Sequence, residues 1–195
     1  MATEVNPFSF RHVTSLTYFF PPETTPALLA ERFEHCGQAA QIIGPHGTGK
    51  STLLETLVQR LKPPVYKTVL RDHQRRLSAD FFEYCSKNCV VVIDGYEQLS
   101  ALSRWRLWLK RRRLGFKLLI TAHRPVFGWP ILYETAPDRE TYNRILQTLL
   151  ENETKNETRI DLQMFDLLYT KHHGNMRRIL LDLYDLWEER TVSRQ

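Results

Sequence analysis

Short apolar runs alternate with amphipathic segments over the first two thirds of the chain. The runs AAQIIG, VYKTVL (65–70), VVVI (90–93), FKLLIT (116–121) and ILYET (131–135) predict five strands. The fully apolar VVVI is typical of a strand that is buried on both faces of a parallel sheet. The segments TPALLAERFEH, KSTLLETLVQRL, LSADFFEYCSK and LSRWRLWLKRRR predict the intervening helices. This alternation indicates an α/β fold with a parallel five-stranded sheet flanked by helices.

The pattern changes near residue 136, at the sequence APD. From Asp138 onward the apolar spacing predicts helices alone, at roughly 138–151, 157–171 and 175–190. Thr25 is a candidate N-cap of the first helix, and Asn175 of the last. We therefore expect two parts, an α/β core with an N-terminal extension over residues 1–136 and a C-terminal α-helical lid over 137–195.

Composition narrows the class of protein. The 195 residues carry a net charge of +5, of which eight positive charges lie between residues 98 and 133, where there is no Asp or Glu, so the rest of the chain has a net charge of −3. No apolar run approaches the ~20 residues of a membrane helix, and the N-terminus has no signal-peptide pattern. The three cysteines have no metal-ligand spacing. We expect a cytoplasmic protein with reduced thiols and no membrane contact.

The segment GPHGTGKS fits the phosphate-loop pattern G-x-x-x-x-G-K-[ST] and lies between an apolar strand and a helix, as that pattern requires. Its glycines let backbone N–H groups approach phosphate oxygens, a lysine contacts the β- and γ-phosphates, and a serine hydroxyl contacts magnesium. The predicted nucleotide-binding residues are Gly44, Pro45, His46, Gly47, Thr48, Gly49, Lys50, Ser51 and Thr52. His46 lies in the variable part of the loop, where a loop-shaping or solvent-facing role is expected.

Asp94 ends the VVVI strand, at the sheet edge where ligands of open α/β sheets bind. With a phosphate loop present, Ser51 and Asp94 are the predicted magnesium ligands. Many ATPases place a glutamate directly after this aspartate to orient the attacking water, but here the next residue is Gly95. Either the protein binds nucleotide without hydrolysing it, or another residue acts as the base, for which Glu97 is the candidate.

These motifs resemble those of P-loop ATPases of the AAA+ and STAND groups. The run Asp94-Gly95-Tyr96-Glu97 is similar to the D-G-x-[DE] pattern of NACHT-like STAND proteins, which implies Glu97 as the water-orienting base. The run LLITAHRP is similar to a STAND segment ending in T-S-R-P and implies Thr121 as the polar sensor at the strand tip. It also implies Arg124 near the γ-phosphate, although this chain has Ala122-His123 where the family usually has one residue.

The run GNMRRIL, 174–180, resembles the AAA+ lid helix and implies Arg177 as a sensor arginine, with Arg178 as its neighbour; a solvated basic helix start is the alternative. The G-x-P of STAND lids is missing here. No N-K-x-D motif for guanine occurs, which favours ATP. The resemblance also implies an adenine pocket between the N-terminal segment and the lid, with Phe8, Phe10, His12 and the region of Tyr142 as candidates.

The basic helix SRWRLWLKRRR follows the Asp94 strand. Helical spacing puts Leu102, Trp105, Trp108 and Leu109 on one face, where the tryptophans are expected to be core anchors rather than base-stacking platforms. The basic residues of 104–117 have three interpretations: phosphate contacts to nucleic acid, an interface with an acidic protein surface such as a neighbouring subunit in a homo-oligomer, or a solvated face.

The sequence therefore predicts a Mg²⁺-dependent ATPase that couples nucleotide state to a partner or an assembly, a DNA-associated one among the candidates. Lys50, Glu97, Thr121, Arg124 and Arg177 are its predicted catalytic residues, with ATP and Mg²⁺ as cofactors. Two alternatives stay open. One is an ATP-binding switch or scaffold with negligible hydrolysis, and the other, less favoured, is a small-molecule kinase.

Overall fold

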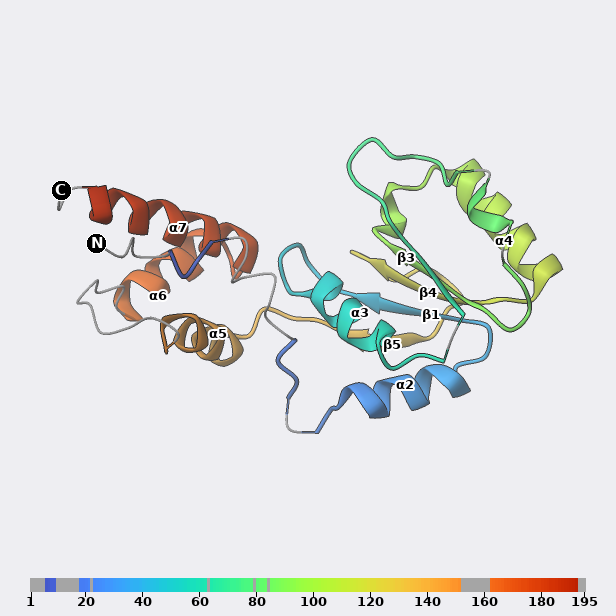
Figure 1. Cartoon of the computed structure of the whole chain (residues 1–195), viewed down its shortest axis with the longest axis horizontal. Helices are drawn as coiled ribbons and strands as arrows, with labels where there is room; N and C mark the ends of the chain where they lie inside the picture. The colour runs from blue at the N-terminus through green and yellow to red at the C-terminus, as the bar shows by residue number, and fades with distance from the viewer. Residues whose placement is uncertain are drawn as a thin grey trace. The chain divides into compact units, whose positions relative to one another are not determined.

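The computed structural model describes residues 6–9, 18–21, 23–62, 64–78, 80–83, 85–151 and 162–192. Five strands form one parallel sheet in the order β2-β3-β4-β1-β5 (Figure 1). The strands are β1 (Ala39–Ile43), β2 (Val65–Val69), β3 (Val90–Asp94), β4 (Lys117–Ala122) and β5 (Ile131–Glu134). β1 and β3 are buried along their whole length. The predicted parallel five-stranded sheet is confirmed.

The helices follow the predicted alternation. They are α2 (Pro26–His35), α3 (Lys50–Val58) and α4 (Ala101–Leu114) among the strands, then α5 (Arg139–Glu151), α6 (Leu162–Lys171) and α7 (Met176–Val192), with short 3₁₀ turns η1 (Asp80–Phe82) and η2 (Tyr96–Gln98). Thr25 caps α2 by accepting a hydrogen bond from the Leu28 N–H. Asn175 Oδ1 accepts one from the Arg178 N–H at the start of α7. Both predicted caps are therefore present.

One predicted helix is wrong. The segment LSADFFEYCSK forms only the single turn η1 among its described residues. Its apolar side chains pack onto the sheet from an irregular segment, as Phe82 does by stacking on Phe116 with ring centroids 6.4 Å apart. The second lid helix, α6, begins at Leu162, and its expected start near residue 157 lies outside the described residues.

The described residues divide into two compact units. One consists of residues within Met1–Phe19, Pro45–Gly49 and Ala136–Gln195, and the other of residues within Phe20–Gly44 and Lys50–Thr135. We call them the helical unit and the sheet unit. The phosphate loop is divided between the two units. Pro45–Gly49 belong to the helical unit, and the flanking residues Gly44 and Lys50 belong to the sheet unit.

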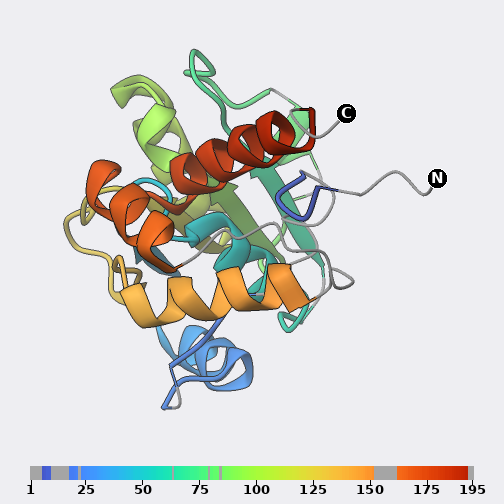
Figure 2. The same ribbon diagram turned by 90° about the vertical axis from the view of Figure 1, so that its left-hand side faces the viewer.

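The helical unit has its own core, formed where α5, α6 and α7 pack together (Figure 2). Phe165, Ile179 and Leu183 are fully buried in it. Phe8 of the N-terminal segment belongs to this core, since it is 3% exposed and meets Trp187 edge-on at 6.1 Å. No helix among the described residues is long and apolar enough to cross a membrane.

The tryptophans of α4 are not core anchors, which corrects the expectation from helical spacing. Trp105 is 56% exposed and Trp108 38%, and Leu102 and Leu109 on the same face are also exposed. The helix instead buries Ser103 and Leu107. Ser103 is held by donating its hydroxyl proton to the Arg75 carbonyl, 2.9 Å away. The buried face of α4 is therefore narrow. The apolar face that the helical spacing defined is exposed to solvent instead.

Candidate nucleotide site

Two neighbouring strands of the sheet unit meet through a pair of buried polar side chains. Asp94 ends β3 and Thr121 lies in β4, and they are 9% and 1% exposed. The Thr121 hydroxyl donates to Asp94 Oδ1 over 2.6 Å and accepts from the Gly95 N–H over 2.8 Å. Both hydrogen bonds fix the direction of the Asp94 carboxylate at the carboxyl edge of the sheet, the edge where such sheets bind ligands.

Gly95 explains why no glutamate follows Asp94 directly. Its φ of 84° lies in the left-handed region, and a Cβ at this position would come within 2.7 Å of the Leu70 carbonyl oxygen. A side chain here is therefore excluded by both backbone strain and a backbone contact. The chain turns at Gly95 into η2, which carries Glu97.

Lys50 and Glu97 are joined by the ring of His123. Lys50 Nζ donates to the Gly44 carbonyl at 2.7 Å and lies 3.1 Å from His123 Nδ1. On the other side of the ring, His123 Nε2 is 2.8 Å from Glu97 Oε1. An ammonium has only donors, so a neutral ring with its proton on Nε2 fits both contacts. The lysine of the phosphate loop and the carboxylate of η2 are thus held in one hydrogen-bonded chain.

The second carboxylate oxygen of Glu97 is available for chemistry. Oε2 is buried and has no hydrogen-bond partner among the described residues. The backbone carbonyl of the same residue accepts from Arg104 at 2.8 Å, and the Arg104 guanidinium lies over the Tyr96 ring at 5.0 Å. Burial of that ring raises the pKa of Tyr96 above its usual range. Glu97 is therefore fixed at both its backbone and Oε1, with Oε2 uncommitted.

The phosphate loop has no room for side chains at its glycines. A Cβ on Gly44, whose φ is 150°, would lie 2.2 Å from Thr135 Oγ1 and 2.3 Å from the Thr135 carbonyl oxygen. In the helical unit, a Cβ on Gly47 would lie 2.1 Å from Asn175 Oδ1. The loop backbone is thus closely surrounded at both points, which requires glycine.

The start of α7 is tied to the loop within the helical unit. The Met176 N–H donates to the Gly47 carbonyl at 3.2 Å, and the Tyr142 hydroxyl donates to the same carbonyl at 3.4 Å. Tyr142 is 4% exposed, and this burial raises the pKa of its phenol. Arg177, the predicted sensor arginine, follows one residue after Met176 and is exposed.

The remaining predicted residues occupy simpler positions. Ser51 and Thr52 are exposed in the first turn of α3. His46 is exposed, in line with the expected loop-shaping or solvent-facing role. Thr48 donates its hydroxyl proton to the Pro45 carbonyl at 2.9 Å, inside the loop. Arg124 is exposed beyond the end of β4, where its side chain is open to solvent.

His123 is the residue that sequence reasoning did not assign. Its signal was the insertion itself, because Ala122-His123 occupies a place where the resembled family has one residue. The extra residue lets β4 continue through Ala122, which pairs with Ile43 of β1. The imidazole that follows then lies beside the Gly44 carbonyl, with Nδ1 at 3.2 Å.

The donor set suits Mg²⁺ bound together with a nucleotide. Among the described residues, no group of three or more His, Cys, Asp or Glu could hold a metal ion by itself. Mg²⁺ usually needs only one or two protein oxygens besides phosphates and water. Asp94 and the Ser51 hydroxyl are oxygens of that kind, and Lys50 and the loop glycines are the groups that phosphates require.

Comparisons with known proteins give partial matches. No model of a known protein family matches the chain. The sequence is 38% identical over 80 residues to the aerobic cobaltochelatase subunit CobS of Sinorhizobium sp., covering 41% of this chain and 22% of that protein. It is 33% identical over 85 residues to the phosphonates import ATP-binding protein PhnC of Nitratidesulfovibrio vulgaris, covering 36% of this chain and 32% of that protein. The chain thus matches less than a third of either relative's length.

Solved structures match over most of the chain. RuvB of Thermotoga maritima, a Holliday junction branch migration motor, superposes with a TM-score of 0.58 at 15% identity, covering 87% of this chain and 61% of the RuvB chain. A DNA replication initiation factor gives a TM-score of 0.50 at 15% identity, covering 89% of this chain and 69% of its own. The chain has the fold of P-loop NTPases, with a C-terminal helical region.

Proposed function

We propose that this protein binds ATP with Mg²⁺ and hydrolyses it, and that it couples its nucleotide state to a partner or an assembly. The observation that carries the proposal is the Lys50–His123–Glu97 chain, in which one imidazole ring links the phosphate-loop lysine to an acid with one uncommitted buried oxygen. A switch that only binds nucleotide has no need of such a carboxylate.

Each residue has a role in this mechanism. The loop N–H groups and Lys50 bind the phosphates, and Ser51 and Asp94 would hold Mg²⁺, which would supply positive charge against the phosphates. Thr121 keeps Asp94 oriented. Glu97 Oε2 accepts the proton of the attacking water, a role that needs hydrogen-bond reach directly or through one more water. Arg124 and Arg177 are proposed to reach the γ-phosphate once nucleotide is bound.

The finer classification is also a proposal. Asp94-Gly95-Tyr96-Glu97 supports a NACHT-like STAND arrangement, because Gly95 cannot carry a side chain and Glu97 is the next acid along the turn. Residues 1–136 are proposed as the nucleotide-binding core with an N-terminal extension, of which Phe8 packs in the helical unit, and 137–195 as its helical lid, in a cytoplasmic protein. The partner is proposed to bind the basic stretch of α4, as a nucleic acid or as an acidic protein surface, including that of a second copy.

Lys50→Ala tests the assignment of the phosphate loop. The variant removes the ammonium that contacts phosphates, so ATP affinity is expected to fall at least tenfold, or turnover to be lost, while the fold stays intact. Equilibrium binding of a fluorescent ATP analogue and circular dichroism check this, with Lys67→Ala as a control that removes a lysine paired with Glu55 on the surface. A folded Lys50→Ala protein with unchanged affinity and rate contradicts the assignment.

A further inference from the structure

The sheet unit has a second hollow, away from the candidate nucleotide site. It is a pocket of about 340 Å³, lined by Cys36, Gln38, Ala39, Trp108, Arg111, Phe127, Gly128, Trp129 and Pro130. Gln38 and Pro130 immediately precede β1 and β5, whereas Gly44 and Gly95 follow β1 and β3. Because all strands are parallel, the pocket lies at the amino ends of the strands and the nucleotide site at their carboxyl ends.

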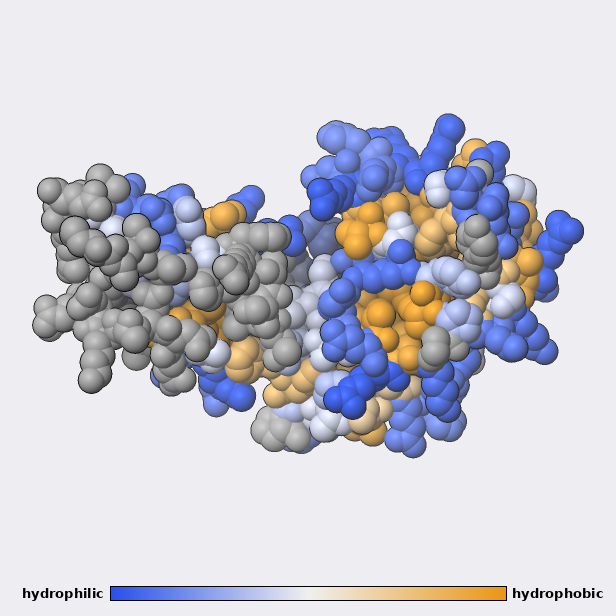
Figure 3. Space-filling model, in the orientation of Figure 1, coloured by the Kyte–Doolittle hydropathy of each residue, from blue (hydrophilic) through white to orange (hydrophobic). Residues whose placement is uncertain are grey.

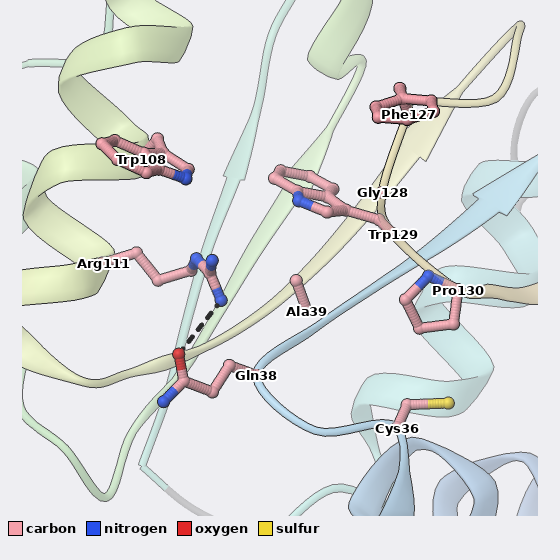
Figure 4. A pocket seen from close by; sticks show the side chains of 9 residues that line it. All are labelled: Cys36, Gln38, Ala39, Trp108, Arg111, Phe127, Gly128, Trp129 and Pro130. Atoms are coloured by element: carbon pink, nitrogen blue, oxygen red, sulfur yellow. Dashed lines mark hydrogen bonds between the residues drawn. The ribbon is translucent and has the colours of Figure 1, made fainter.

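Aromatic side chains form the walls of the pocket (Figure 4). Trp108 projects from α4 and Trp129 comes from the loop on the other side. Phe127 is fully exposed at the tip of that loop, and Trp108 is 38% exposed. Exposed apolar side chains that line one pocket are typical of an interaction site, for a protein, a membrane or a ligand. Figure 3 shows hydrophobic surface among hydrophilic residues on the part of the molecule that carries the sheet.

The loop that presents Phe127 is rigidly held. Gln41, which is fully buried in β1, donates to the carbonyls of Val126 and Trp129 at 3.0 and 2.8 Å, and its Oε1 accepts from the Val126 N–H at 2.7 Å. A buried amide with three hydrogen bonds to one loop fixes that loop's backbone. Phe127 is therefore exposed on a fixed support, which lowers the entropy cost of binding a ligand.

Arg111 places a guanidinium with unused hydrogen-bond donors in the pocket. Its Nη1 donates to the neutral amide oxygen of Gln38 at 3.3 Å, and its Nε is buried without a hydrogen-bond partner among the described residues. The described ion pairs do not include Arg111. Burial, with the neighbouring charge of Arg112, lowers the pKa of Arg111. A half-buried guanidinium of this kind favours an anionic group, and its planar fork suits phosphate or carboxylate oxygens.

The surroundings favour a polyanion with flat rings. On α4 itself, Arg106, Lys110, Arg112 and Arg113 are exposed, and no acidic residue lies between 98 and 133. The Arg112 guanidinium already stacks over the Trp108 ring at 4.9 Å. Aromatic platforms beside a basic track are the arrangement by which proteins hold single-stranded nucleic acid, since every base has a face that can stack. An acidic protein surface would satisfy the cations but leave the aromatic walls without flat partners.

We propose that this pocket binds single-stranded nucleic acid, with an unpaired base against Trp108, Phe127 and Trp129 and a backbone phosphate on Arg111. The proposal rests on the partner-binding part of the proposed function, for which it names the ligand and the pocket, but it does not depend on ATP hydrolysis. It predicts that a single strand binds more tightly than a duplex of the same length, because duplex bases cannot leave the stack without cost.

Matched variants on the same helix test the pocket. Trp108→Ala and Arg111→Ala are each expected to weaken binding of a short fluorescein-labelled oligothymidylate about tenfold or more, measured by fluorescence anisotropy at low and physiological salt. Trp105→Ala and Arg106→Ala lose the same chemical groups outside the pocket. Trp105→Ala is expected to change affinity less than threefold, and Arg106→Ala, which removes one cation of the basic track, is expected to weaken binding less than Arg111→Ala does. ATP binding should be unaltered in all four, while Lys50→Ala should leave oligonucleotide binding unaltered.

Cys36 supplies a second readout from inside the pocket. Cys85 and Cys89 are buried, and burial with the neighbouring Cys89 raises the pKa of Cys85 to about 12, so Cys36 is expected to react first with iodoacetamide. Bound oligonucleotide should slow that reaction. If the pocket and control variants lose equal oligonucleotide affinity, or if the oligonucleotide does not slow alkylation of Cys36, the pocket is not the binding site.

Two other outcomes would assign this surface to a different ligand. Failure to bind DNA or RNA oligonucleotides at low salt, with binding of polyglutamate that Arg111→Ala weakens, would assign the surface to an acidic protein. Self-association in sedimentation that Trp108→Ala abolishes would assign it to a second copy of the chain.

Discussion

At the scale of single residues, the site depends on backbone positions that accept only glycine and on one unassigned histidine. The positions of the phosphate loop and Asp94 at strand ends could be predicted from sequence, and the resemblance implied that of Thr121; their roles stay predictions. The hydrogen bond between Thr121 and Asp94 then follows from β3 and β4 being neighbours. The contacts of His123 could not be predicted, since they depend on where the residue after β4 points.

Gly44→Ala is expected to destabilise the sheet unit by about 1–3 kcal/mol, because the new Cβ would meet both the side chain and the carbonyl of Thr135. Gly37→Ala is the matched control. Gly37 also has a positive φ, 74°, but a Cβ at this position would have nothing within 4 Å, so only backbone strain is added. Urea unfolding should therefore show a larger fall in the free energy of unfolding for Gly44→Ala than for Gly37→Ala. An equal fall in both variants would contradict the close packing around the loop.

His123→Ala tests whether the imidazole positions Glu97. Without it, the carboxylate loses the partner of Oε1, and we expect the turnover number to fall by roughly ten- to hundredfold with a smaller change in KM. The control is His35→Ala, an exposed histidine whose ring bonds to the Glu31 carbonyl of its own helix. Steady-state ATP hydrolysis gives the split between kcat and KM, and an unchanged kcat would remove His123 from the mechanism.

At the scale of elements, hydrophobic patterning located the strands well but misjudged two segments on one side of the sheet. LSADFFEYCSK has helical spacing, yet its aromatic residues are satisfied by packing from the single turn η1. The apolar stripe of α4 faces solvent, because the helix is anchored through Ser103, Leu107 and Arg104 instead. Sequence spacing defines the faces of a helix, but it does not decide which face meets the sheet when both carry apolar residues.

The junction of α6 and α7 should show a defined pH dependence. Lys171 and then His172 donate hydrogen bonds to Asp182 and lower its pKa. A carboxyl whose folded pKa is below its unfolded value of about 3.9 contributes stability above that pH and loses it as pH falls through the folded pKa. Asp182→Asn should therefore cost about 0.2–1 kcal/mol near neutral pH, and the difference from wild type should vanish in strong acid.

Thermal unfolding of both proteins between about pH 2 and 7 measures this, with Asp185→Asn as an exposed control on α7. The control should behave like wild type throughout. If the difference in unfolding temperature between Asp182→Asn and wild type is independent of pH, the ion pairs of Asp182 with Lys171 and His172 do not stabilise the junction.

At the scale of the whole molecule, Asn6 and Phe8 near the N-terminus pack in the helical unit. Asn6 donates to Glu188 Oε1 at 2.8 Å and to the Tyr184 carbonyl at 3.1 Å, and Phe8 is buried against Trp187. The resemblance had made Phe8 a candidate for the adenine pocket, and its side chain is instead largely used in this core, whereas the candidates Phe10 and His12 lie outside the described residues. Such a long-range pairing of the two chain ends leaves no local pattern in the sequence, which is why it could not be predicted.

The central claim is that the chain hydrolyses ATP with Glu97 as the base, and Glu97→Gln tests it most directly. The change keeps the size of the side chain and removes the charge, so ATP binding should be preserved while turnover falls by about 10²–10⁴-fold. ATP affinity and single-turnover hydrolysis are measured on wild type and variant, with and without an oligonucleotide. A variant that binds ATP and is turnover-deficient is the predicted result. Equal hydrolysis by both proteins, or no hydrolysis by wild type under either condition, would contradict the account.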